Sequence, residues 1–444
     1  MTLAGFAPRA ALVAALLVSG LPGAARAQAA PAAMPTGTLP GGVSYELRPD
    51  ATQSATAIAL WYRAPAGGFG EPAIPGFSAL AADTVAASAG LTGTSLGELV
   101  DGFGGVLSVA VYPDSVSVTA VVPPERASAV VRAMTGAYFA PVVTDDGFQV
   151  GLRETGQDAL VRSFDPSDAI ENALGASLFA TGPLHDGTIP AAGAFKGIDA
   201  AQVRTFAERA FRPSNAILVL TGAVDAGVLS GVANRPEVST AGSEPPAPQT
   251  AQPSPRPSAA PIVANATGVG LGWVGPPIAD EESATALDFL ADALFAPHTG
   301  LVTRAVADRK VSVSGKFVTY HSAGVFLVTL SGDDVPAAVP IVEQTIARAV
   351  KPLAPAAFAA AKAGFVYRLL GDMETPGEIA DTYGWYAVEG DAAYAPAEGG
   401  TAGRYFALAD ALTPQSVARV AARYLGGAPA TVTLIKAQTK ASPT

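Results

Sequence analysis

Few residues in this chain have side chains suited to catalysis or metal binding. The 444 residues include 3 His and no Cys, which excludes disulfides, thiolate zinc sites and cysteine nucleophiles. Histidine chemistry would have to use His185, His298 or His321. No two of these are spaced as ligands on one helix would be. We predict a loop contact for the first, a helix-end contact for the second and an exposed strand end for the third.

Two glycine-containing motifs resemble catalytic loops but lack the required context. Gly93–Gly97 matches G-x-S-x-G, yet it follows a helix-like stretch, whereas a nucleophile elbow lies between a strand and a helix. Ser95 with Glu98 instead predicts a capping box at a helix start. Gly268–Trp273 lacks the spacing of a dinucleotide loop and lies within a strand-like run. We therefore predict that both motifs have structural roles.

The amino-acid composition indicates a folded protein and excludes several classes of partner. Apolar residues make up 49% and charged residues 15% of the chain, which disfavours disorder. The net charge of −11 argues against a nucleic-acid or anionic-membrane partner. After the N-terminal segment, no apolar run is long enough to span a membrane. Trp61, Trp273 and Trp385 are predicted to be core residues.

The first 27 residues have the features of a secretory signal peptide. Arg9 precedes the apolar run 10–17, and the small-residue stretch ends in Ala25-Arg26-Ala27 before Gln28. We expect cleavage near Ala27 and a mature chain that is periplasmic or secreted. The absence of Cys fits an oxidising compartment.

A Pro-, Ser- and Ala-rich segment, 241–261, divides the mature chain. It has no hydrophobic period and predicts an exposed, extended linker. The flanking blocks, 35–240 and 262–440, are of similar size. Near-equal blocks raise the possibility of an internal repeat.

The two blocks repeat one order of predicted elements. Each has a strand-like run, a helix-like stretch, a turn, two strand-like runs and a further helix. The block ends match more closely, because Val203 and Val417 lie 214 residues apart, in helices opened by Asp199 and Thr413. We predict an α+β fold of two homologous α/β sandwich domains, formed by tandem duplication.

A series of motifs in the first block runs from Pro75–Asp83 through Gly93–Leu99 and Gly104-Gly105 to Asp114 and Val122–Glu125. This order resembles the pitrilysin/insulinase family of metallopeptidases, which includes the mitochondrial processing peptidases. Those proteins carry G-x-x-H-x-x-E-H on a helix, then G-T, then G-G before a substrate-side strand. The resemblance covers nearly all of 35–440 and implies domains of the LuxS/processing-peptidase-like type.

The resemblance also implies a zinc site, from which this chain departs. Family peptidases bind zinc with two His four residues apart and a later Glu, and a Glu beside the second His activates water. These positions hold Ala79, Ala82 and Asp83, with Asp158 near the third ligand. We therefore predict no catalytic residue, metal ligand set or cofactor, and leave open whether any activity remains.

Some family proteins divide the work between two chains, and the resemblance implies an Arg and a Tyr in the partner's second half that hold substrate. The matching positions here are Val306 and Val313. A shifted register would bring Arg304 or Arg309 close to the Arg position, although a solvated helix face also explains both. Tyr320 is the only nearby Tyr, so we predict that the pair is absent.

Peptide binding does not require the zinc residues. In the family, peptides add a strand to a sheet edge through main-chain hydrogen bonds. The candidate edge is 106–110, with Val106, Ser108 and Ala110 as contacts; the alternative is an ordinary paired strand.

Three functions therefore remain open. The first is a non-catalytic subunit that pairs with a catalytic paralogue carrying H-x-x-E-H and completes a chamber for unfolded peptides. The second is an independent periplasmic peptide-binding or chaperone-like protein. The third is a metallopeptidase with non-standard ligands such as Asp83 and Asp158.

Overall fold

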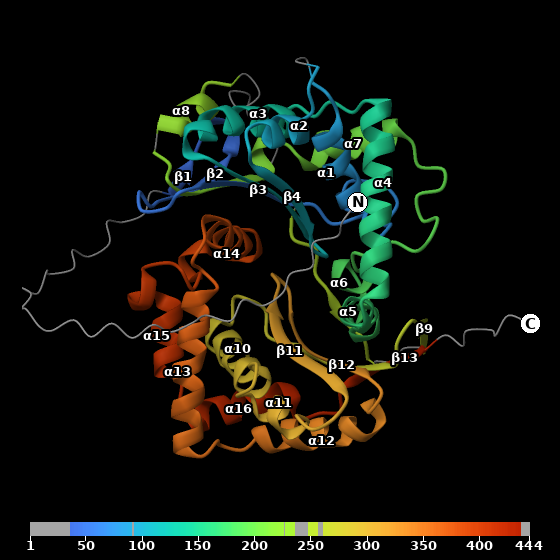
Figure 1. Cartoon of the computed structure of the whole chain (residues 1–444), viewed down its shortest axis with the longest axis vertical. Helices are drawn as coiled ribbons and strands as arrows, with labels where there is room; N and C mark the ends of the chain where they lie inside the picture. The colour runs from blue at the N-terminus through green and yellow to red at the C-terminus, as the bar shows by residue number, and fades with distance from the viewer. Residues whose placement is uncertain (1–35, 91–92, 226, 236–246, 256–260, 437–444) are drawn as a thin grey trace, which may run out of the picture. The chain divides into compact units, whose positions relative to one another are not determined.

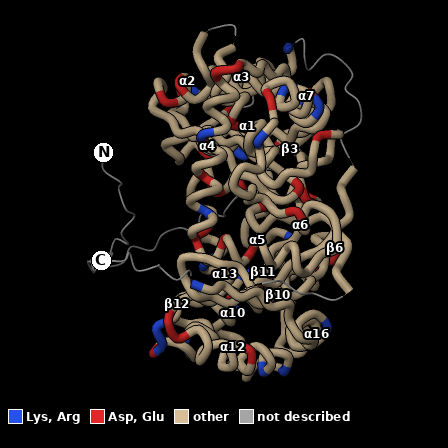
Figure 2. The backbone as a smooth tube through the Cα atoms, turned by 90° about the vertical axis from the view of Figure 1, so that its right-hand side faces the viewer, with Lys and Arg blue, Asp and Glu red and all other residues tan. Residues whose placement is uncertain are grey.

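The computed structural model describes residues 36–90, 93–225, 227–235, 247–255 and 261–436, which belong to one compact unit. The predicted signal peptide lies outside these residues. No helix in the described ranges is both long and apolar enough to cross a membrane. Charged residues are sparse along the backbone (Figure 2).

Six strands form the first sheet in the order β1-β2-β7-β3-β5-β4. Neighbours pair antiparallel except β2 with β7. The central strand β3 is buried on both faces, because both are covered by helices. The strands are β1 (Thr36–Thr38), β2 (Ser44–Pro49), β3 (Thr56–Arg63), β4 (Val106–Val111), β5 (Ser115–Val122) and β7 (Ala216–Gly222).

Five strands form the second sheet in the order β11-β12-β10-β13-β9. The run β13-β10-β12-β11 repeats the order β7-β3-β5-β4 of the first sheet, and each run ends in an edge strand. The predicted fold class is thereby confirmed. The strands are β9 (Ile262–Ala264), β10 (Gly268–Gly275), β11 (Val311–Thr319), β12 (Gly324–Gly332) and β13 (Ala430–Lys436).

One face of each sheet is packed against helices of its own half. Three predicted caps are present: Ser95 with Glu98, and Asp199 and Thr413 at the starts of the repeated helices. The first-half helices are α1 (Phe77–Ala87), α2 (Leu96–Gly102), α3 (Ala127–Phe139), α4 (Asp145–Phe164), α7 (Ala200–Ala210) and α8 (Gly227–Ala233). The second-half helices are α10 (Glu281–Phe295), α11 (Leu301–Ala305), α12 (Val335–Ala349), α13 (Pro355–Gly371), α15 (Arg404–Ala411) and α16 (Pro414–Leu425).

The other face of each sheet is covered by a helix from the opposite half (Figure 1). Helix α14 (Pro376–Glu389) packs Gly384 against Trp61 on β3, and Tyr383 belongs to the same buried cluster. Helix α5 (Pro166–Leu178) packs Leu174 against β10, β12 and β13 of the second sheet. The two halves therefore share apolar cores.

Glycine makes the second of these contacts possible. A Cβ atom at Gly270 would lie 2.1 Å from Ile170 Cγ2, and one at Gly272 would lie 3.0 Å from Leu178 Cδ1. The glycines of the Gly268–Trp273 run thus let α5 approach β10, which agrees with the predicted structural role.

The described part of the predicted linker is not fully exposed. Gln252–Pro253 forms β8, which pairs with β6 (Phe179–Thr181), and Ala251 is 5% exposed within the core that α5 shares with the second sheet. Most of the other described linker residues are exposed, so Ala251 and the β8 pairing are local exceptions that composition does not reveal.

Candidate functional site

The motif helix α1 borders a cavity of about 570 Å³, together with α4 and the edge strand β4. Ala79, Asp83 and Asp158 all line this cavity. Ala82 does not line it. Its side chain is buried in the first core, and its carbonyl accepts a hydrogen bond of 2.9 Å from the Tyr138 hydroxyl. Three of the four predicted motif positions therefore come together around one cavity.

Small residues bring α4 close to α1. A Cβ atom at Gly151 would lie 2.4 Å from Thr84 Oγ1, so no larger residue fits there without a shift. One turn further along α4, the hydroxyl of Thr155 donates a hydrogen bond of 2.8 Å to Asp83 Oδ2. Asp158 lies nearly one turn beyond, is 65% exposed and forms an ion pair with Arg162 at 3.8 Å. The residue that faces Asp83 is thus Thr155.

Burial raises the pKa of Asp83 to about 7. The hydrogen bond from Thr155 opposes this shift, while the charges of Glu154 and Asp158 add to it. Near neutral pH this carboxyl is therefore protonated in a large fraction of molecules.

These residues do not fit the zinc site that the motif order implies. Ala79 has no ligand atom, Asp83 has one carboxyl group that already accepts from Thr155, and His is absent from the cavity lining. The residues that the structure describes contain no group of three or more His, Cys, Asp or Glu able to hold a metal. Since zinc peptidases need three ligands and a base, no zinc-dependent step can be assigned here.

The free edge of β4 faces the same cavity, because residues Leu107 to Val111 all line it. Tyr112 N–H donates to the Ser115 carbonyl across the β4–β5 turn at 2.9 Å. Hydrogen-bonded pairs alternate along an antiparallel ladder. The main-chain groups of Leu107, Val109 and Val111 therefore point away from β5, toward the open edge.

The candidate contacts Val106, Ser108 and Ala110 alternate with these residues. In this register their main-chain groups pair with β5, so they meet an added strand through side chains only. Sequence alone does not reveal this difference, because the pairing register is set by the turn.

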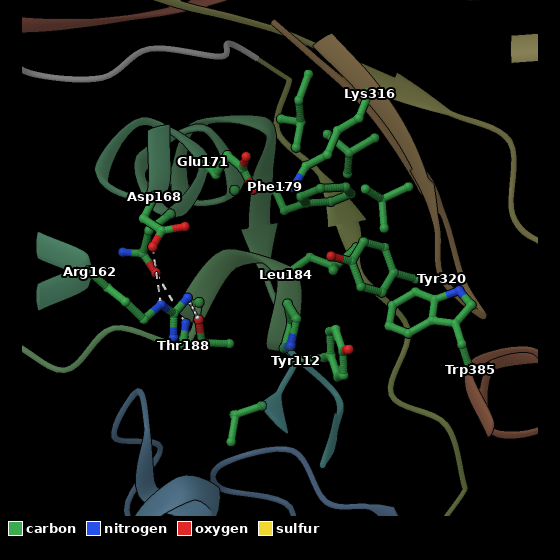
Figure 3. A pocket seen from close by; sticks show the side chains of 18 of the residues that line it. Tyr112, Arg162, Asp168, Glu171, Phe179, Leu184, Thr188, Lys316, Tyr320 and Trp385 are labelled. Atoms are coloured by element: carbon green, nitrogen blue, oxygen red, sulfur yellow. Dashed lines mark hydrogen bonds and ion pairs between the residues drawn. The ribbon is translucent and has the colours of Figure 1, made fainter. Parts of the chain in front are cut away.

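A second cavity, of about 400 Å³, lies beside the first, and Val111, Arg162 and Thr188 line both. Arg162 Nη2 donates to Thr188 Oγ1 at 2.9 Å and Nε lies 3.5 Å from Asp168 (Figure 3). Lys316 on β11 pairs with Glu171 on α5 at 2.8 Å. The cavity is thus lined by charged residues of both halves.

Aromatic side chains line the same cavity opposite the charged groups. The ring centroids of Tyr112 and Trp385 lie 4.8 Å apart, and those of Tyr320 and Trp385 lie 5.4 Å apart (Figure 3). Trp61 and Trp273 are buried as predicted, whereas Trp385 is only partly buried. Sequence reasoning missed Lys316 and the cavity role of Trp385, since neither belongs to a motif.

The remaining candidates lie elsewhere. Val306 is buried and Val313 packs partly against the second core, so neither faces the two cavities. Arg304 lines a separate groove between α10, α11 and α13. His185 contacts Asp186 at 2.9 Å in α6 (Pro183–Asp186). His298 has a positive φ of 62° after the end of α10, and His321 is an exposed turn residue that binds main-chain oxygen of Glu389.

Comparison with known proteins adds a sequence match and a fold match. The family model described as "Peptidase M16 inactive domain" matches residues 197–365, and no curated protein sequence matches the chain. A structure described as an M16-like peptidase from Alicyclobacillus acidocaldarius has a TM-score of 0.75 at 17% identity and covers 91% of this chain and 98% of its own. Residues 197–365 therefore match an M16 inactive domain, and the chain as a whole has the fold of an M16-like peptidase. The resemblance to pitrilysin and insulinase is thereby confirmed.

Two further structures share this fold. A protease from Helicobacter pylori has a TM-score of 0.71 at 15% identity, covering 90% of this chain and 98% of its own. A chain of complex III2 from Candida albicans has a TM-score of 0.72 at 13% identity, covering 90% of this chain and 95% of its own. The chain is therefore a pitrilysin-like protein that lacks the zinc motif at Ala79, Ala82 and Asp83.

Proposed function

We propose that the mature chain is an exported, non-catalytic M16 subunit. It binds extended peptides along β4 and pairs with a zinc-bearing relative to complete a peptide-processing chamber. The observation that carries this proposal is the free edge of β4, which faces a cavity of about 570 Å³ where Ala79 and Asp83 stand in place of zinc ligands.

The β4 edge supports peptide binding for a physical reason. Leu107, Val109 and Val111 present unpaired main-chain groups to the cavity. An extended peptide satisfies such groups by adding one strand, and its affinity comes mainly from main-chain hydrogen bonds. Loss of zinc ligands on α1 leaves this edge intact.

Peptides with N-methylated main chains test this mode directly. A peptide paired antiparallel with β4 turns alternate N–H groups toward the strand. Methylation of the N–H groups that face β4 should abolish binding of the peptide to the mature chain. Methylation of the intervening N–H groups, which point away from β4, should leave binding nearly unchanged. Equal effects of both sets would contradict strand addition.

A matched pair of proline variants locates the strand. Val109→Pro removes an N–H that points to the cavity, and Pro is tolerated at such edge positions. Val313→Pro removes the equivalent outward N–H of β11, because the hydrogen bond from Tyr320 N–H to the Ala323 carbonyl sets the same register there. We expect only Val109→Pro to weaken peptide binding, by at least about tenfold.

Partner pairing is tested by co-expression with an M16 relative that carries H-x-x-E-H. One of the similar structures is a chain of a larger complex, which supports assembly with other chains. We expect the two chains to co-purify and to cleave a fluorogenic peptide library together. Zinc-dependent cleavage by this chain alone would refute a non-catalytic role. Peptide binding without any such partner would favour the independent peptide-binding protein instead.

Export is tested at the N-terminus. We expect mass spectrometry of periplasmic or secreted material to find a chain that begins at or near Gln28, because the preceding residues have signal-peptide features. An intact Met1 in a cytoplasmic fraction would contradict export.

A further inference from the structure

The second half contains a small aromatic cavity that peptide binding along β4 does not use. Its volume is about 110 Å³, and it lies between α10, β11, α14 and α15. Asp288 on α10 is the only acidic residue in its lining. The aromatic lining residues are Phe317, Trp385, Tyr386, Tyr394 and Tyr405.

Three of these rings contact one another around the cavity. The ring centroids of Tyr386 and Tyr394 lie 5.4 Å apart, and those of Tyr394 and Tyr405 lie 5.3 Å apart. The ring centroids of Tyr386 and Tyr405 lie 6.5 Å apart, and the two ring planes make an angle of 81°. Aromatic faces carry negative potential, and several rings around one space attract an organic cation.

Asp288 adds a carboxyl group to this ring cluster. The Tyr405 hydroxyl donates a hydrogen bond to its Oδ2 atom. Burial raises its pKa to about 6, the Tyr405 hydrogen bond opposes that shift, and the charges of Asp292 and Asp372 add to it. The carboxyl is thus mainly ionised at neutral pH, although its charged neighbours are acidic. A partly buried carboxylate in this setting is stabilised by a cation.

The internal repeat sets this carboxyl apart from Asp83. Each Asp follows an Ala by four residues, Ala79 or Ala284, on the helix after the central strand of its sheet. Asp83 faces a wide cavity beside Thr155, whereas the cavity beside Asp288 is small and mostly aromatic. The duplicated position thus has a different chemical environment in each half.

We propose that the cavity at Asp288 binds the ammonium group of an organic amine. The carboxylate neutralises the charge and the surrounding rings contact the alkyl or methyl groups, as in aromatic cages for methylated ammonium ions. A cavity of about 150 Å³ holds benzene, so 110 Å³ suits a trimethylammonium group or the end of a lysine side chain.

Val318 and Trp385 line both the aromatic cavity and the cavity of about 400 Å³, so the two cavities adjoin. The same ammonium chemistry is offered by two sources, a lysine side chain of a bound peptide and a free amine such as choline.

Calorimetric titration of the mature chain with choline tests the proposal. The comparison ligand is 3,3-dimethylbutan-1-ol, which has the shape of choline without its charge. We expect choline to bind at least about tenfold more tightly than the alcohol. Equal affinities, or no binding of choline at roughly millimolar concentration, would overturn the proposal. This test needs no variant and no peptide, so its result is independent of β4 binding.

Two variants locate the site. Asp288→Asn keeps the shape and removes the charge, and should lower choline affinity at least about tenfold. Asp372→Asn removes an exposed charge that acts on Asp288 without lining the cavity, and should change affinity less than about twofold because such charges are screened. Full choline affinity in Asp288→Asn, with thermal unfolding like that of the wild type, would refute the site.

A pair of peptides then separates the two sources. Both add to β4, and they differ only in one residue, Lys or its uncharged isostere norleucine. If peptide lysine is the ligand, choline should compete with the Lys peptide and leave binding of the norleucine peptide unchanged. If choline competes with neither peptide but still binds wild type and not Asp288→Asn, the ligand is a free amine.

Discussion

At the residue scale, two carboxyl groups from opposite halves meet at one buried point. Asp114, in the turn between β4 and β5, interacts electrostatically with Glu389 at the end of α14. Glu389 also accepts from Ser115 Oγ at 3.4 Å and from His321 N–H at 2.9 Å. Burial raises the pKa of both carboxyls, and the Arg63 guanidinium only partly opposes this. The protonated form of each carboxyl is therefore favoured in the folded chain relative to the unfolded chain.

This pair predicts a stability that falls as pH rises. The folded chain holds a proton that the unfolded chain releases above the usual carboxyl pKa, so the free energy of unfolding decreases from about pH 5 toward pH 8. Glu389→Gln keeps a polar side chain beside Asp114 and removes the titration of residue 389, so we expect a flatter dependence than in the wild type. Urea unfolding at the two pH values measures this. Glu125→Gln, an exposed control, should leave the slope unchanged. Parallel slopes for wild type and Glu389→Gln would contradict the assignment.

At the element scale, the close contact between α5 and the second sheet depends on glycines of β10. Gly270→Val would place its side chain into Ile170 and Leu174 of α5. We expect a loss of about 1–3 kcal/mol in the free energy of unfolding, as for overpacked cores. Gly156→Ala is the matched control. Gly156 is an exposed position of α4, and nothing lies within 4 Å of the added Cβ atom. It should raise stability by about 0.5–1 kcal/mol, because Ala favours a helix. Chemical denaturation of both variants tests the contrast, and an unaffected Gly270→Val would show that α5 does not pack this closely.

At the scale of the whole molecule, the exchanged helices make each half depend on the other. A fragment of residues 35–240 would leave the β3 face of Ala57, Ala59 and Trp61 without α14. We expect this fragment to bind a hydrophobic dye and to lack the cooperative unfolding of the full chain, because that apolar face would be exposed. Co-expression with residues 262–440 should restore both properties. A separately folded fragment with full-chain thermal stability would contradict this dependence.

Local features and the internal repeat could be predicted from the amino-acid sequence. Fold class, duplication and the caps at Ser95, Asp199 and Thr413 follow from patterns within a few residues or between the two blocks. The loss of the zinc motif at Ala79, Ala82 and Asp83 is also evident from the sequence, because the motif is defined by residue types at fixed spacing.

Contacts between residues far apart in the sequence could not be predicted, because they depend on how the helices and sheets pack. Thr155, rather than Asp158, faces Asp83 because small residues let α4 pack close to α1. The turn register assigns the open main-chain groups of β4 to Leu107, Val109 and Val111. The packing of α5 and α14 on the sheet of the opposite half is not evident from the sequence, because an apolar helix face can pack against either sheet. The aromatic cavity around Asp288 likewise combines rings that lie far apart in the chain, and only packing brings them together.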